Sequence, residues 1–221
     1  MDIFSCDIPN LRIKKYGKRR DPIEVIEAAI KLDAWDGYLT HRYENGRKIA
    51  DGTVKLDFGG TAPGITRDWE PEVRAYNYLL ENQQAIRDSI LRTLVEGWEQ
   101  FKETYYLDPA DDPDVPDITP ANRDAFDLKP FIGPQSIAFH EETKDGVAYL
   151  EWFLNCTWDP EHGLAAITHQ DRVIDLDRGE TDIWKIFADN GTYEEQMRDY
   201  KEREKNAPPR KQQQKPWWKF W

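Results

Sequence analysis

The longest regular pattern of apolar positions in the chain lies between residues 71 and 106. Steps of three, four and seven residues there keep apolar side chains on one face of an α-helix, so the pattern predicts a helical region packed against a sheet. Because such a helix is long for a globular protein, we expect a break near Asn82. Asp68 precedes the region as a candidate cap. The predicted stripe consists of Leu79, Ile86, Ile90, Leu94, Trp98, Phe101 and Tyr105.

A second helical pattern is predicted in DPIEVIEAAIKLDAW, residues 21–35. Asp21 and Pro22 suit the cap and the first position of a helix. After Asp182, the runs IWKIFAD and TYEEQMRDYKEREKNA also favour helices, with fewer apolar positions toward the end of the chain. The apolar face of the first of these helices is expected to carry Ile23, Ile26, Ala29, Ile30 and Trp35.

Alternating apolar and polar residues predict strands before the long helical region. In residues 37–60, Asn45-Gly46 is a strong hairpin signal and Asp51-Gly52 indicates a second turn. This segment is therefore expected to form a small antiparallel meander. A short strand near the start of the chain is indicated by Leu11, Ile13 and Tyr16.

Strand patterns return after an acidic, proline-rich connector that begins near Leu107. The run VAYLEWFLNCTW is the most strand-like of the chain, a turn is predicted at Lys144-Asp145-Gly146, and two shorter strands are expected to join near Gln170-Asp171. These patterns predict an α+β fold, with a mainly antiparallel sheet packed on one side against the long helical segment. Residues 1–200 are predicted to form a single domain, and residues 201–221 a tail.

Charge narrows the classes of partner. The chain has 42 acidic and 30 basic residues, a formal net charge of −12, which should repel nucleic acid and anionic membranes but suits a basic partner protein.

No apolar run reaches the roughly 18 residues that span a bilayer, and MDIFSCDIPN does not resemble a secretory signal. A cytoplasmic location is therefore expected. Cys6 and Cys156 do not supply a disulfide framework or a four-thiolate zinc site, and no cofactor is predicted.

The run CTWDPEHG, from Cys156 to Gly163, is the most distinctive polar motif. Asp159-Pro160 begins a turn readily, because proline fixes φ and the Asp side chain accepts from backbone N–H groups ahead of it. Gly163 permits a positive φ where the chain enters the next strand. Trp158 suits a strand end that covers the core. A turn between two strands thus explains all of these residues.

Glu161 and His162 are not required by that turn, and three uses remain open for them. In a structural role, Glu161 or Asp159 accepts from neighbouring N–H groups or from Arg172, while His162 packs on an aromatic ring. In recognition, Trp158, the acids and His162 contact a partner protein. In catalysis or metal binding, Asp159, Glu161 and His162, together with His140 or His169, form a His/carboxylate site.

The segment 145–176 resembles a bacterial family of uncharacterised domains with the signature Cys-x-Trp-Asp-x-Glu-His-Gly between two strands. The resemblance implies a small acidic protein of the kind found beside toxin genes, where such proteins act as immunity factors. The chain departs from the family pattern after the last strand, where DLDRGETDIWK replaces a glycine-rich stretch. The matching residues are Cys156, Trp158, Asp159, Glu161, His162, Gly163, Arg172 and Val173.

The tail, residues 201–221, is basic and ends in PWWKFW. Trp217, Trp218 and Trp221 are expected to be covered, because exposed aromatics in such number favour aggregation. Docking on the acidic body of the same chain, contact with a partner, contact with a membrane interface and simple disorder are the alternatives.

Together these features favour a non-enzymatic intracellular binding protein, of immunity type, that engages a basic toxin-like effector through an acidic surface. The alternative is a metal-dependent or acid–base enzyme centred on Asp159, Glu161 and His162. No residue is assigned as catalytic, and no membrane span is expected. The sequence leaves the oligomeric state and the partner's identity open.

Overall fold

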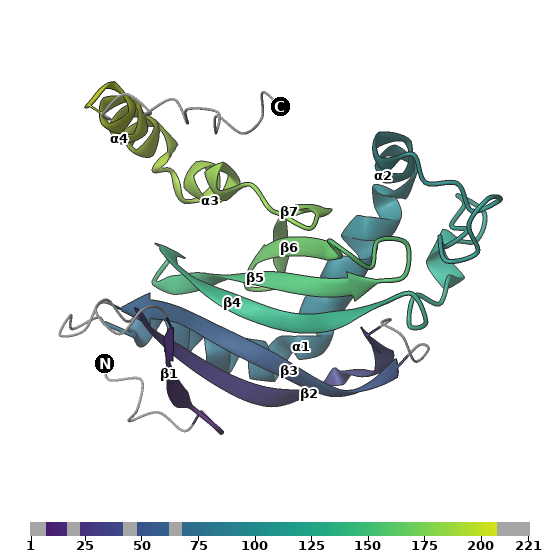
Figure 1. The fold of residues 1–221 in the computed structure, drawn as a ribbon, viewed down its shortest axis with the longest axis horizontal. Coiled ribbons are helices and arrows are strands. Elements are labelled where there is room, and N and C mark those ends of the chain that lie inside the picture. Colours follow the sequence, from purple (N-terminus) through teal and green to yellow (C-terminus); the bar gives the residue numbers. More distant parts are fainter. Residues whose placement is uncertain (1–7, 17–22, 42–47, 62–67, 207–221) are drawn as a thin grey trace, which may run out of the picture.

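The computed structural model describes residues 8–16, 23–41, 48–61 and 68–206. Within them, seven strands form one sheet in chain order, β1 to β7, and every neighbouring pair is antiparallel except β3 and β4 (Figure 1). This arrangement confirms the predicted α+β class. The strands are β1 (Arg12–Tyr16), β2 (Ile23–His41), β3 (Lys48–Thr61), β4 (Ile132–Lys144), β5 (Val147–Cys156), β6 (Leu164–His169) and β7 (Arg172–Arg178). The helices are α1 (Glu70–Glu96), α2 (Trp98–Tyr105), α3 (Ile183–Asn190) and α4 (Tyr193–Asn206).

The helix predicted for residues 21–35 is wrong, because residues 23–41 form the long strand β2. From Ile26 to Ala34 its buried apolar side chains alternate, as a strand with one covered apolar face requires, although Glu27 between them is buried as well. Ile26 and Ile30 are four residues apart, a spacing that fits both a helix face and a strand face, so these two positions carried no information on the choice. Pairing with β1 and β3 on both sides decides it. The buried set is Ile26, Ala28, Ile30, Leu32 and Ala34.

The predicted turn at Asp51-Gly52 is also wrong, since both residues lie inside β3. Gly52 has φ +78° there, within a part of the β2–β3 pairing where the register shifts. A positive φ in a strand is typical of a bulge, and glycine permits it without strain. The Asn45-Gly46 turn lies outside the described residues, although β2 and β3 pair antiparallel on either side of it.

The helical region between β3 and β4 follows the sequence prediction closely. Asn82 has non-helical backbone angles, φ −122° and ψ 19°, at the expected break, and α1 passes into α2 at Gly97. Asp68 accepts from the N–H of Glu70, although the residue at the cap position itself is Trp69. The apolar stripe of α1 is buried against the sheet at Leu79, Ile86, Ile90 and Leu94.

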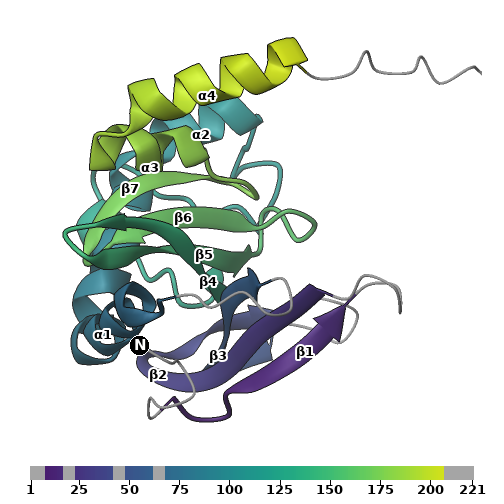
Figure 2. The ribbon, with the colours of Figure 1, turned by 90° about the vertical axis from the view of Figure 1, so that its left-hand side faces the viewer.

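The sheet has a different cover on each face. Helix α1 packs across one face and contacts β2, β4, β5 and β7, whereas α3 packs on the other face near β4 and β7 (Figure 2). The larger core lies under α1 and includes the rings of Trp35, Trp98 and Trp152. The smaller core lies under α3 and is formed by Tyr149, Ile167 and Ile186. The helices predicted after Asp182 are therefore confirmed.

Candidate functional site

Residues 157–163 of the CTWDPEHG run, which we call the signature turn, join β5 to β6. The Gly163 N–H donates to the Asp159 carbonyl at 2.9 Å, and Gly163 has φ +70°. A Cβ at this position would lie only 2.4 Å from the Leu154 carbonyl oxygen. Glycine is required here both by the backbone angle and by the close approach of β5.

Asp159 is buried inside this turn and collects three polar contacts. Its Oδ1 accepts from the backbone N–H of His162 at 3.1 Å and lies 3.1 Å from Nδ1 of the same residue. Its Oδ2 accepts from Nε of Arg178, the last residue of β7. Burial raises the pKa of the Asp159 carboxyl, but the hydrogen bonds from Arg178 and His162 outweigh it and hold that pKa below its ordinary value.

Arg178 continues the cluster toward α2. Its guanidinium carbon lies 5.5 Å from the centre of the Tyr105 ring, and the Tyr105 hydroxyl donates to Asp177. In the same region, the Trp158 ring of the turn meets the Trp98 ring of α2 edge-on, with centroids 5.2 Å apart. The hydrogen bond from Tyr105 to Asp177 and burial raise the pKa of the Tyr105 hydroxyl. The signature turn is thus tied to both the last strand and α2.

The sequence prediction misplaced two partners of this motif. Arg172 lies at the other end of β7 and donates to Asp189 at 2.6 and 2.8 Å, so it is not the partner of Asp159. His162 contacts Asp159 and Arg178 rather than an aromatic ring, and its side chain is 56% exposed. Glu161 is exposed. Counting pairs back from the turn at Gln170-Asp171 would have placed Arg178 near Gly163, so the signal for Arg178 was present in the sequence.

The histidines suggested for a metal or catalytic site do not meet. His169 Nε2 lies 3.0 Å from the Lys144 carbonyl, and His140 lies between Glu142 and Glu151, at 3.7 and 3.3 Å. His162 sits at the opposite end of β6 from His169. In the part of the chain that the structure describes, no three His, Cys, Asp or Glu residues gather closely enough to hold a metal ion. Cys156 is buried, with its sulfur 3.5 Å from the Asp159 carbonyl oxygen.

A second polar cluster, absent from the sequence prediction, fastens α3 to the sheet. Asp189 of α3 accepts from Lys144, from the Tyr149 hydroxyl at 2.7 Å and from Arg172. The hydrogen bonds from Arg172 lower the pKa of the Asp189 carboxyl most, against a smaller opposing effect of burial. These residues come from β4, β5 and β7, so only the folded sheet brings them together.

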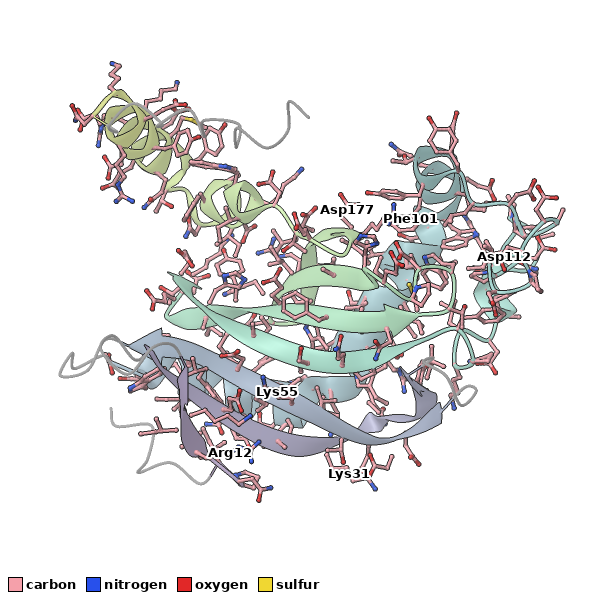
Figure 3. The ribbon with its side chains drawn as sticks, in the orientation of Figure 1. Arg12, Lys31, Lys55, Phe101, Asp112 and Asp177 are labelled. Carbon is pink, nitrogen blue, oxygen red and sulfur yellow. The ribbon has the colours of Figure 1, made fainter. Side chains whose placement is uncertain are left out.

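A groove of about 470 Å³ lies between β7 and the junction of α1 with α2. One wall is formed by α2 and carries the Phe101 ring, and the other is the outermost strand β7 with Asp175 and Asp177. Figure 3 shows Phe101 and Asp177 on the two sides of this groove. The side chains of Val173 and Leu176 pack toward the core under α1. Sequence reasoning did not find this groove, because it depends on where α2 lies relative to the sheet edge.

Negative charge is concentrated next to the groove. We call residues 96–127 the acidic segment; it contains ten acidic and two basic residues and includes α2 and the connector after it. Nearly all of these acids are exposed, whereas Val115, Ile118 and Leu128 anchor the connector in the core. Figure 3 shows Asp112 of this segment on the side of the molecule away from Arg12, Lys31 and Lys55, which lie on β1–β3.

A model of the family described as a domain of unknown function, DUF6985, matches residues 31–183, about two thirds of the chain. The match begins inside β2 and covers the strands β3 to β7, both α1 and α2, and the whole signature turn. No curated protein and no solved structure matches the chain. Among the helices of the described residues, none is both long enough and apolar enough to cross a membrane.

Proposed function

This chain belongs to the DUF6985 family of domains of unknown function, and from that premise we propose that it is a non-enzymatic binding protein. In this proposal the acidic segment, residues 96–127, engages a basic partner protein. The finer assignment that we propose is an immunity-type protein of the bacterial cytoplasm that neutralises a basic toxin-like effector. The resemblance of the signature turn to domains found beside toxin genes supports that finer assignment.

The observation that carries the proposal is the placement of charge. The acidic segment has eight more acids than bases, in a chain whose formal net charge is −12. It is also held in one conformation, since Val115 and Ile118 are buried and the Thr157 hydroxyl donates to the Asp114 carbonyl. A preorganised patch of one sign accelerates association with a partner of opposite sign and costs less ordering entropy on binding.

The contacts of the signature residues fit a structural role better than a catalytic one. The Asp159 carboxylate already accepts from Arg178 and His162. The cavity beside it measures only about 50 Å³, far below the few hundred Å³ of ordinary ligand sites. The geometry therefore gives no support to an enzyme centred on Asp159, Glu161 and His162.

A charge-reversal comparison tests the proposal. Glu103→Lys, Asp111→Lys and Asp117→Lys change exposed acids of the acidic segment. A matched triple, Glu194→Lys, Glu195→Lys and Glu202→Lys, makes the same change in net charge on exposed sites of α4. The products of neighbouring genes are produced singly and titrated against each protein by calorimetry, at low and at high ionic strength.

We expect one basic gene product to bind, more tightly at low ionic strength. The acidic-segment triple should weaken that binding about tenfold or more, because it removes the charge complementarity between the patch and the basic partner. The α4 triple should change affinity less than about threefold, since those sites lie outside the patch. Equal weakening by both triples, or no binding by any neighbouring gene product, would contradict the proposal.

A further inference from the structure

The groove between β7 and the α1–α2 junction exposes the edge of the sheet. β7 is the last strand in the sheet order, and five consecutive residues of it, 173 to 177, line the groove. The opposite wall includes Gly97, Phe101 and Thr104 of the helices. A sheet edge that is left open in a groove is a template for one more strand.

The direction of the β7 backbone groups follows from the ladder. The Gly179 N–H donates to the Gly163 carbonyl, so these two residues form a hydrogen-bonded pair. Antiparallel pairs alternate, and the pairing runs on through Leu164↔Arg178, Ala165↔Asp177 and Ala166↔Leu176. The N–H and C=O of Asp177 therefore point to β6, whereas those of Arg178 and Leu176 point to the open edge.

The same reasoning, applied from the other end of β7, shows that Val173 also directs its backbone groups to the open edge. His169 and Arg172 flank the two-residue turn at Gln170-Asp171, so they form a hydrogen-bonded pair and the next pair, Thr168↔Val173, does not. The Val173 N–H and C=O thus also point to the open edge. The register shift between Ile167 and Thr168 accounts for the spacing of three residues between Val173 and Leu176.

Local hydrogen bonds close this edge at one end only. The Arg178 N–H donates to the side-chain carboxylate of Asp177 at 2.7 Å, and the Arg178 carbonyl accepts from the Glu180 N–H at 2.7 Å. Among the described residues, no comparable bond blocks the edge at Leu176. The open stretch from Val173 to Leu176 lies in the wall of the groove that β7 forms.

The chemistry of the groove selects the occupant. Asp175 and Asp177 of β7 line the groove and supply negative charge to it. Leu94 and Phe101 supply apolar contact. Alternate residues of an added strand face opposite sides, so a segment that alternates basic and apolar side chains matches both features.

We propose that this groove binds an extended basic segment of the partner protein as an additional strand on β7. This inference rests on the proposed function and specifies how the basic partner is held. Main-chain hydrogen bonds at Val173 and Leu176 supply affinity, and the surrounding acids select the charge.

The probe is a synthetic peptide of about ten residues that alternates lysine and valine, since such a length is that of an ordinary strand. Three further peptides serve as comparisons: one with alternate backbone amides N-methylated, one with glutamate replacing lysine, and one with the residues in a non-alternating order. Binding to the full chain is measured by fluorescence anisotropy, and backbone protection by hydrogen exchange of the Leu176 amide.

Two protein variants separate backbone from side chain. Leu176→Pro removes an N–H that points away from β6, so it blocks strand addition and leaves the β6–β7 ladder in place. Leu176→Ala removes the same side chain but keeps the N–H. N-methylation of the peptide also tests whether main-chain hydrogen bonds supply the affinity, and it leaves the protein unchanged.

We expect the alternating lysine–valine peptide to bind and to slow exchange at Leu176. N-methylation and Leu176→Pro should each weaken binding about tenfold or more, and Leu176→Ala less than about threefold, because the main chain supplies the affinity. The glutamate peptide should not bind.

Other results overturn the inference, and they differ from those that overturn the proposed function. Equal binding of the N-methylated or non-alternating peptide would show capture by charge alone, so the acidic segment would stand and strand addition would fall. No binding of the lysine–valine peptide would also reject the groove, even if the gene-neighbour titration succeeded.

Two further outcomes would identify a different occupant of the groove. If removal of residues 207–221 speeds exchange at Leu176, the tail is the occupant. If Leu176→Pro abolishes a dimer, a second copy is the occupant.

Discussion

Gly163 and Asp159 show how the signature turn acts at the scale of single residues. The positive φ of Gly163 brings the chain back over β5, and this return leaves Asp159 enclosed with His162 and Arg178. The acid is then the acceptor that joins the turn to the last strand. The conspicuous polarity of CTWDPEHG is therefore explained by fold geometry for Asp159 and His162, while Glu161 stays exposed.

Replacement of Gly163 tests this geometry. Gly163→Ala should lower the free energy of unfolding by more than the about 1–2 kcal/mol of a left-handed alanine, because its Cβ also meets the Leu154 carbonyl. Gly191→Ala is the matched control, since Gly191 has φ +82° with no atom within 4 Å of the added Cβ. Urea unfolding of both variants measures the difference. Equal losses would mean that the close approach to β5 carries no cost.

His140 is the residue whose charge state should be visible in solution. Burial lowers its pKa, but the carboxylates of Glu142 and Glu151, 3.7 and 3.3 Å from its ring nitrogens, reverse this effect and raise the pKa from 6.5 to about 9. Glu151 also accepts from the Thr181 hydroxyl, so the imidazolium links β4 and β5 to the segment before α3. The histidine is therefore expected to be charged at neutral pH.

The pH dependence follows from the raised pKa. A group with a higher pKa in the folded state stabilises it fully below its unfolded pKa, near 6.5, and loses that contribution as pH rises through about 9. The loss should amount to about 3 kcal/mol at most. Urea unfolding of the wild type and of His140→Gln between about pH 6 and about pH 10 measures it. A difference between the two proteins that stays constant over this range would contradict the ion pair.

At the scale of elements, the polar clusters attach helices to the sheet. Within helix α3 only Ile186 is fully buried, and Asp189 receives hydrogen bonds from three strands. Helix α4 contacts α3 and has no buried residue. The position of both helices therefore depends on Asp189 to a degree that their apolar content does not suggest.

Asp189→Ala should loosen α3 and α4 before the rest of the fold. We expect a loss of about 1–3 kcal/mol in the free energy of unfolding, because Tyr149, Lys144 and Arg172 lose a shared charged acceptor. Hydrogen exchange should speed up in residues 183–206 and stay unchanged in α1. Glu202→Ala, at an exposed site of α4, is the control. Uniform acceleration over the whole chain would show that Asp189 acts on global stability instead.

At the scale of the whole molecule, two parts of the sheet are joined by few backbone bonds. The parallel pairing of β3 with β4 covers only three residue pairs. Helix α1 crosses this junction and packs on strands of both parts, as Figure 2 shows. The rings of Trp35 in β2 and Trp152 in β5 also meet there, with centroids 5.9 Å apart. Side-chain packing, more than the backbone ladder, therefore makes the sheet one body.

A core substitution in α1 tests this coupling. Ile86→Ala should cost about 2–5 kcal/mol, as truncation of a fully buried aliphatic side chain does, and unfolding should remain a single transition. Far-ultraviolet circular dichroism and tryptophan fluorescence should give the same urea midpoint. Leu80→Ala, at an exposed position of the same helix, should have little effect. Separated midpoints would mean that the two parts unfold independently.

The sequence by itself determined the elements whose signals are local. The stripe of α1, its break at Asn82, the turn at Asp145-Gly146 and the positive φ of Gly163 depend on spacing or on one residue's backbone freedom, so they could be predicted. The α+β class followed from these elements. The polar run CTWDPEHG also pointed to the turn that Asp159 closes.

Tertiary structure alone decided the rest, because it depends on which distant segments meet. Residues 23–41 carry apolar positions compatible with two periods, and only pairing with β1 and β3 selects the strand. Arg172 meets Asp189 only because α3 packs back on the sheet, and nothing in the sequence pattern indicated that pair. The groove exists because α2 stands beside the free edge of β7, more than sixty residues away in the chain. Contacts of that range leave no periodic trace in the sequence, so they become visible only in the folded molecule.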